Sequence, residues 1–155
     1  KAGEIGHMKI SIDDLRCSCG RTGCWELYAS ERALLRDCNN KSKVKFESLE
    51  ELFKKNLVGD ELLRNILDRY LDYLAMGIQN IILTLAPEYV IVGGKISSYE
   101  DRLLKPLTEK VLLRSSFIDK SDTHIIFSKL KEDASILGAS LLPLNSLFNY
   151  RKNVI

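Results

Sequence analysis

The sequence predicts an α/β fold in which helices separate short strands. Three segments have strand-like patterns, at His7–Ile12, Tyr89–Val92 and His124–Phe127. Apolar and polar residues alternate in the first, whereas β-branched residues dominate the other two. A long helical pattern over Glu61–Leu85 lies between the first strand and the second. Because strands separated by helices favour parallel pairing, we expect a small sheet with some parallel pairs.

The helical pattern from Glu61 to Leu85 is the strongest in the chain. Apolar residues recur there at three- and four-residue steps, with charged residues on the opposite face. The apolar positions are Leu63, Leu67, Leu71, Leu74, Ile78, Ile82 and Leu85, and the charged ones are Arg64, Asp68 and Asp72. Ala86-Pro87 is expected to end this helix, since the residue before a proline disfavours helical backbone.

Shorter helices are predicted elsewhere from capping and turn signals. The stretch from Tyr28 to Cys38 is helical in pattern, and Ser48-x-x-Glu51 is a capping box that opens a helix with Leu49, Leu52 and Phe53 inside.

Two more helices are expected in the second half of the chain. Ser97-x-x-Glu100 predicts a helix to about Leu113, with a kink at Pro106. A closing helix over Ala134–Leu142 is expected to end before Pro143. Its small residues Gly138, Ala139 and Ser140 predict tight packing against the body.

Composition places the chain among ordinary globular domains. It has 155 residues, 45% of them hydrophobic and 28% charged, and a net charge of +2 from 23 basic and 21 acidic residues. No apolar stretch approaches the ~20 residues that span a bilayer, and no signal segment opens the chain, so a cytoplasmic protein is expected. No basic stripe predicts a nucleic-acid surface within this segment.

The chain is expected to be part of a longer polypeptide. It begins with Lys1 rather than an initiator Met, its first motif follows almost at once, and three strands are few for a covered sheet. We therefore expect residues 1–155 to be a single incomplete domain, with further strands upstream.

The densest chemical motif lies near the amino end. His7 is followed ten residues later by Cys17-Ser18-Cys19-Gly20, and then by Gly23-Cys24. Three thiolates and an imidazole form a complete tetrahedral site for zinc, with no place left for a catalytic water. The two glycines allow the tight turns that bring Cys19 and Cys24 to one ion. A structural zinc site is therefore predicted.

Other interpretations of the cysteines stay open on sequence grounds. They could be buried free thiols or disulfides, although disulfides are uncommon in the cytosol and three cysteines within eight residues are denser than packing requires. Cys38 is interpreted as a small hydrophobic residue at the end of a helix. An all-thiolate site, with Cys38 in place of His7, is the less favoured alternative.

These motifs resemble the ROK family of bacterial sugar kinases and sugar-responsive repressors. The resemblance rests on Gly3-Glu4-Ile5-Gly6-His7, on Cys17-x-Cys-Gly-x-x-Gly-Cys-x-Glu26, on their ten-residue offset and on Val90-Ile-Val-Gly-Gly94. It covers the chain from Gly3 to about Leu147. It implies part of the second domain of an actin-like (ribonuclease H-like) sugar kinase fold, with long helices packed on a small sheet and a zinc-braced loop over about residues 1–29.

The resemblance also assigns residue roles. It implies that His7, Cys17, Cys19 and Cys24 bind zinc and that Glu4, His7 and Glu26 bind a sugar. Carboxylates and an imidazole suit vicinal hydroxyls, because each accepts hydrogen bonds in a defined direction. The alternative for either glutamate is an exposed, solvated side chain.

The pair Gly93-Gly94 is the predicted cofactor-contacting turn. Glycines between a strand and a helix permit close approach to a phosphate, and the resemblance places a nucleotide near this turn in the kinases. Lys95 replaces a residue that is usually small there, so a tight packing turn is an equal alternative. ATP with magnesium is expected only if the parent protein is a kinase.

Three functions follow as alternatives. The first is the sugar-sensing part of a transcriptional repressor, favoured by Trp25 within Cys24-Trp25-Glu26-Leu27-Tyr28, which is similar to the xylose-repressor branch. The second is the carboxyl half of an ATP-dependent, glucokinase-like sugar kinase, whose catalytic Asp and phosphate loops would lie upstream. The third is a small zinc-finger-like interaction module. The expected partners are a sugar, DNA through an upstream domain, and a second copy in a homodimer; no membrane is expected, and the segment alone is expected to be catalytically silent.

Overall fold

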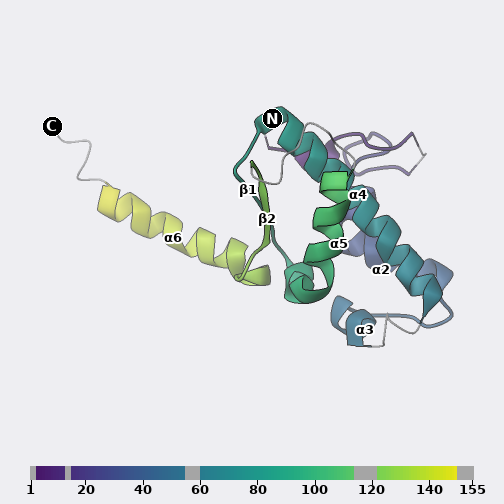
Figure 1. Ribbon diagram of the computed structural model, residues 1–155. Helices are drawn as coiled ribbons and strands as arrows, with labels where there is room; N and C mark the ends of the chain where they lie inside the picture. Colours follow the sequence, from purple (N-terminus) through teal and green to yellow (C-terminus); the bar gives the residue numbers. More distant parts are fainter. Residues whose placement is uncertain (1–2, 13–14, 55–59, 114–121, 150–155) are drawn as a thin grey trace.

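The computed structural model describes residues 3–12, 15–54, 60–113 and 122–149, and helices predominate among them (Figure 1). The α-helices are α1 Glu26–Ala29, α2 Glu31–Lys41, α3 Leu49–Lys54, α4 Glu61–Leu85, α5 Glu100–Leu113 and α6 Ala134–Asn149. The 3-10 helices are η1 Ile5–His7, η2 Lys95–Tyr99 and η3 Lys131–Asp133, and the strands are β1 Tyr89–Val92 and β2 His124–Phe127.

Helix α4 is the centre of the packing, as its sequence pattern predicts. The side chain of Asp60 accepts a hydrogen bond from the Leu63 N–H at 3.2 Å and caps the helix. Helices α1, α2 and α5 pack against α4. The predicted end is confirmed: Ala86 takes a left-handed conformation with φ 44°, and its N–H bonds to the Ile82 carbonyl. Leu85, the last apolar position of the pattern, is 68% exposed.

Strands β1 and β2 form the sheet of the described residues, and they run parallel. The register pairs Tyr89 with His124 and Val92 with Phe127, and α5 lies in the connection between the two strands. Phe127 is buried on one face of the sheet, whereas Ile91 is exposed on the other. The predicted α/β class with parallel pairing is therefore confirmed.

The predicted amino-terminal strand over His7–Ile12 is wrong. This segment forms a single antiparallel bridge, between Lys9 and Cys24, and begins inside η1. Its backbone partner is the returning arm of the cysteine loop rather than a sheet: the Trp25 N–H donates to the Met8 carbonyl at 2.8 Å. Alternation of apolar residues does not distinguish such a loop arm from a strand.

The helix pattern from Tyr28 to Cys38 is confirmed but is divided at Ser30. This residue ends α1 and begins α2, and its hydroxyl accepts the Ala33 N–H at 3.2 Å. The helix start predicted at Ser48 is also confirmed, since the Ser48 hydroxyl accepts the Glu51 N–H at 3.2 Å, whereas the Glu51 carboxylate accepts the Glu47 N–H and not that of Ser48.

The predicted cap at Ser97 is wrong. Its hydroxyl donates to the Gly94 carbonyl at 2.6 Å inside η2, and α5 starts only at Glu100. A 3-10 turn placed before the helix uses the serine locally, which the capping pattern alone does not distinguish.

Helix α6 differs from the prediction in length and in packing. It continues through Pro143 to Asn149, so this proline does not end the helix as expected. A proline takes one N–H donor from a helix, and Ala139, four residues before it, is an exposed residue. It projects from the body (Figure 1), and a side chain placed on Gly138 would meet nothing within 4 Å. Large apolar side chains of α6 are exposed: Ile136, Leu137, Leu141, Leu142 and Leu144.

Candidate metal and ligand site

The segment between η1 and α1 is a loop folded back on itself. The Cys17 N–H donates to the Arg21 carbonyl at 2.8 Å, and a second single bridge joins Arg16 to Thr22. Gly23 has φ +75°, and a Cβ there would lie 1.9 Å from the Ser11 carbonyl oxygen. Only glycine meets both demands, so the tight return expected from the sequence depends on this residue.

The four predicted metal ligands converge in this loop. One donor atom each of His7, Cys17, Cys19 and Cys24 lies within 4.8 Å of the others. The Cys17 sulfur is 3.4 Å from His7 Nδ1, and the Cys19 and Cys24 sulfurs are 3.6 Å apart. With zinc bonds of about 2.3 Å to sulfur and about 2.0 Å to nitrogen, tetrahedral geometry places ligands roughly 3.5 to 3.8 Å apart. The side chains therefore fit a tetrahedral metal.

Cys38 lies outside this cluster. It is fully buried on α2 within the apolar core, and burial raises the pKa of its thiol to about 11. This agrees with its interpretation as a small hydrophobic residue and not with the alternative in which it replaces His7.

The clustered thiols differ in acidity. Hydrogen bonds from the backbone and side chain of Arg21 lower the pKa of the exposed Cys19 thiol to about 6. Burial, together with hydrogen bonds to Cys19 and Cys17, raises the pKa of the Cys24 thiol to about 12. Because cysteine binds metals as the thiolate, Cys19 is ready to bind at neutral pH, whereas Cys24 must release a proton.

Trp25 anchors the loop to α4. Its indole N–H donates to the Tyr73 carbonyl at 2.8 Å, and its ring lies so close to Gly77 that a Cβ there would be 1.9 Å from the ring. The ring of Tyr73 also packs against the ring of Tyr28, with centroids 4.7 Å apart. These contacts support the interpretation of Trp25 as a core anchor. The sequence pattern did not identify Gly77 as the residue against which it packs.

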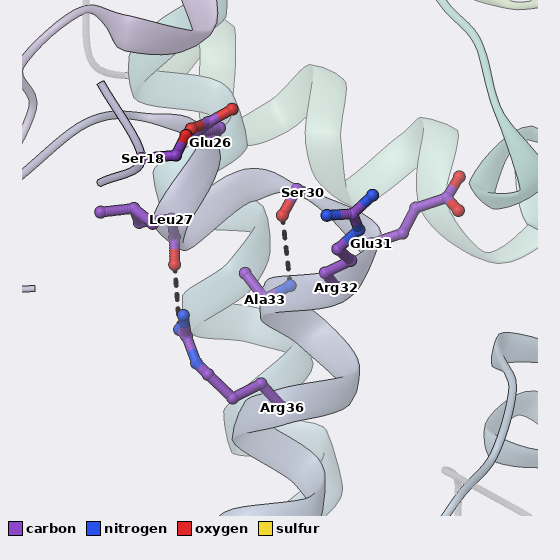
Figure 2. Close-up of a pocket in the computed structure, with 8 residues that line it drawn as sticks. All are labelled: Ser18, Glu26, Leu27, Ser30, Glu31, Arg32, Ala33 and Arg36. Carbon is purple, nitrogen blue, oxygen red and sulfur yellow. Dashed lines mark hydrogen bonds between the residues drawn. The ribbon is translucent and has the colours of Figure 1, made fainter. Parts of the chain in front are cut away.

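Glu26, the first residue of α1, touches the cluster directly. Its Oε1 accepts a hydrogen bond from the Cys17 sulfur at 2.9 Å and lies 3.4 Å from His7 Nδ1. Glu26 also lines a cavity of about 720 Å³. The other residues that line this cavity are Ser18, Leu27, Ser30, Glu31, Arg32, Ala33 and Arg36 (Figure 2).

Of the three predicted sugar ligands, the structure brings His7 and Glu26 together. Glu4 lies directly before η1 and is exposed, and its carbonyl accepts the His7 N–H at 3.1 Å. Its side chain forms no hydrogen bond or ion pair with any described residue, so its place beside a ligand stays a prediction.

The glycine turn lies between β1 and η2. Gly94 has φ +90°, and the Glu31 carboxylate fills the space where its Cβ would stand, at 2.5 Å. The same carboxylate accepts the Ile96 N–H at 2.9 Å. Lys95 pairs with Glu132 at 2.9 Å. Sequence reasoning missed Glu31, because no local pattern predicts a contact across 65 residues.

Comparison with known proteins places these features in a family. A model of the ROK family matches residues 1–145. The xylose repressor of Bacillus spizizenii is 32% identical over 152 residues, which are 97% of this chain and 39% of that protein. The glucokinase of Thermotoga maritima is 34% identical over 152 residues, with 88% of this chain and 47% of that protein covered.

Solved structures show the same architecture. A ROK family glucokinase from Streptomyces griseus, in complex with glucose and AMPPNP, superposes with a TM-score of 0.77 at 24% identity, over 91% of this chain and 51% of that one. A ROK family transcriptional regulator, a homologue of the E. coli MLC protein, superposes with a TM-score of 0.69 at 25% identity, over 91% and 38%. The chain thus spans about half the length of these relatives or less, and its fold is part of their sugar-kinase fold. Within the part that the structure describes, no helix is long and apolar enough to cross a membrane.

Proposed function

Because this chain belongs to the ROK family, with repressors and glucokinases among its relatives, we propose that it is the zinc-braced, sugar-contacting part of a sugar-responsive transcriptional repressor. The observation that carries the proposal is the contact of Glu26 with the cluster of His7, Cys17, Cys19 and Cys24 at the edge of a cavity. The family assignment leaves no support for a zinc-finger-like module.

The metal's role would be orientation. Cys17, Cys19, Cys24 and one nitrogen of His7 would hold the zinc, and the tautomer of the His7 imidazole and the direction of its other nitrogen would then be fixed. As a metal-bound thiolate, Cys17 would no longer donate to Glu26, and the Glu26 carboxylate would be available for ligand hydroxyls. Glu26 and, from the resemblance, Glu4 would accept hydrogen bonds from vicinal hydroxyls, and the N–H on the other ring nitrogen of His7 would donate to a hydroxyl oxygen.

Signalling would follow by population shift. A sugar held between this part and the upstream part would favour one angle between them, to the extent of its differential affinity for the two arrangements. In a homodimer, that angle sets the spacing of DNA-reading helices carried upstream. Both the homodimer and the upstream DNA contact belong to the proposal, as does a cytoplasmic location.

The alternative is the carboxyl half of an ATP-dependent sugar kinase, favoured by the likeness to the Thermotoga glucokinase. It requires a nucleotide at Gly93-Gly94 and a catalytic Asp upstream. The occupation of this turn by the Glu31 carboxylate favours the repressor, because a phosphate would meet a negative charge there.

Calorimetric titration of the full-length protein with D-xylose and D-glucose, with and without zinc, tests the proposal. We expect one zinc per chain, sugar binding that requires it, and a loss of at least about tenfold in affinity for Glu26→Ala. Glu88→Ala, which removes another exposed carboxylate, is the control and should bind as the native protein does. Phosphorylation of the sugar by ATP would favour the kinase, and sugar binding unaffected by zinc removal would refute the metal's role.

A further inference from the structure

Glu31 connects the ligand cavity to the glycine turn. It lines the same cavity as Glu26, yet Figure 2 shows its side chain extending away from Glu26. Its Oε1 accepts the Ile96 N–H at 2.9 Å and fills the space beside Gly94. Glu31 therefore contacts both the cavity and the glycine turn, which are far apart in the sequence.

The link from Glu26 to Glu31 passes through Ser30. The Ser30 N–H donates to the Glu26 carbonyl at 3.3 Å, and the Ser30 hydroxyl accepts the Ala33 N–H at 3.2 Å. Ser30 is thus at once the C-cap of α1 and the N-cap of α2. Ser30 therefore joins the end of the helix that begins at Glu26 to Glu31, the first residue of α2.

The link continues beyond the turn to α6. The Gly94 N–H donates to the Lys131 carbonyl at 3.4 Å, and Lys95 Nζ lies 2.9 Å from the Glu132 carboxylate. Lys131 and Glu132 belong to η3, which runs directly into α6. These hydrogen bonds, the ion pair and the intervening backbone therefore form a continuous path from the cavity to the start of α6.

We propose that Glu31 is a positioning residue that couples ligand occupancy at Glu26 to the glycine turn, η3 and α6. The inference rests on the proposed sugar-binding function. It adds a route by which sugar binding changes the stability of the glycine turn, η3 and α6. The contact suits this role because a charged acceptor makes a stronger hydrogen bond than a neutral one. Gly94, at φ +90° and without a Cβ, leaves the room that the carboxylate needs.

Hydrogen exchange of the zinc-loaded, full-length protein tests the coupling, with D-xylose and D-glucose as probes. Without sugar, Glu31→Ala should speed exchange of residues 94–99 by about tenfold, since it removes one charge-assisted hydrogen bond. With saturating sugar, the native protein should show changed exchange in residues 94–99 and 131–142. At a sugar concentration that also saturates the variant, Glu31→Ala should lose that distant change.

Two further variants separate the coupling from general destabilisation. Glu132→Ala removes a carboxylate from η3. The Glu132 side chain pairs with Lys95 and accepts no backbone N–H of a described residue, so this variant should keep the sugar-induced change at residues 94–99. Glu31→Gln keeps an acceptor of the same shape without the charge, and it should give an intermediate response even if Glu31→Ala does not fold.

The outcomes distinguish the two proposals. Sugar binding with an undiminished distant response in both Glu31 variants overturns the coupling and leaves the sugar site standing. A native protein that binds neither sugar, but whose turn is still loosened by Glu31→Ala, overturns the proposed function, and the coupling falls with it.

Discussion

At the scale of single residues, the cysteine loop combines thiols of very different acidity around one point. Cys19 is exposed and acidified by Arg21, whereas Cys24 is buried and resists ionisation. A metal-binding loop of this kind depends on its ion to hold several donors together, because thiols at 3.6 Å gain little from one another.

Replacement of Cys19 should show this dependence. We expect Cys19→Ser to lose zinc and to lower the melting temperature by about 10 °C, because a metal that binds only the folded state contributes its binding free energy to stability. Metal analysis and calorimetry measure the two effects. Cys38→Ser, which places a hydroxyl in the apolar core, should lower the melting temperature and keep the metal. An unchanged melting temperature for Cys19→Ser would count against the zinc site.

Thiol reactivity in the metal-free protein should follow the same order. With a pKa of about 6, Cys19 is mostly thiolate at pH 7, so its alkylation by iodoacetamide should rise from pH 5 and level off by about pH 8. Cys24 and Cys38, with pKa values of about 12 and 11, should stay unreactive over this range. Peptide mass spectrometry gives the rates. Equal labelling of Cys19 and Cys24 at pH 7 would contradict the assignment, and zinc should protect Cys19.

At the scale of elements, the loop is positioned by its contact with α4 rather than by its own backbone. The indole of Trp25 lies over Gly77 and bonds to the Tyr73 carbonyl. This contact holds Glu26, the next residue, at the cavity. The helix that carries the core therefore also sets the place of the ligand-binding carboxylate.

Gly77→Ala should disrupt this anchor. Alanine favours helix by about 1 kcal/mol, but overpacking against the ring and loss of the indole hydrogen bond should outweigh this, for a net loss of about 2 kcal/mol. Trp25 is the single tryptophan of the chain, so its fluorescence should shift to the red. Gly138→Ala, at a helical glycine with open space around it, is the matched control and should be neutral or slightly stabilising. A stabilised Gly77→Ala with native fluorescence would contradict the anchor.

At the scale of the whole molecule, large apolar side chains are exposed in two places. Exposed apolar side chains lie on the open face of the sheet, as at Ile91 and Ile126, and along α6. Large exposed apolar surfaces normally mark a contact with another surface. The relatives are about twice as long as the matched segment or longer, and we propose that a further part of this protein, corresponding to their remaining length, covers these side chains.

Hydrogen exchange of α6 should test this cover. In the 155-residue chain alone, amides of residues 136–144 should exchange fast, because the helix has few buried contacts. In the full-length protein they should be protected by at least about tenfold. Protection that appears only at high concentration of the isolated chain would show that a second copy covers α6 instead.

The sequence by itself determined the elements whose signals are local. The period of α4, the helix start at Ser48, the β-branched strands and the spacing of the metal donors were all predictable, because each depends on neighbours a few residues apart. The residues proposed for the sugar came from the family motif. Local patterns misled where a residue had two possible partners, as in the segment from His7 to Ile12 and at Ser97.

Only the tertiary structure decided the contacts between distant segments. Three such contacts join residues from nine to 65 positions apart. Trp25 packs against Gly77, Cys17 donates a hydrogen bond to Glu26, and the Ile96 N–H donates to Glu31. Such pairs leave no periodic trace, because each depends on how whole helices pack. The exposure of α6 also became known only from the tertiary structure. The apolar composition of the helix is compatible with burial, but the sequence does not show which other element, if any, packs against it.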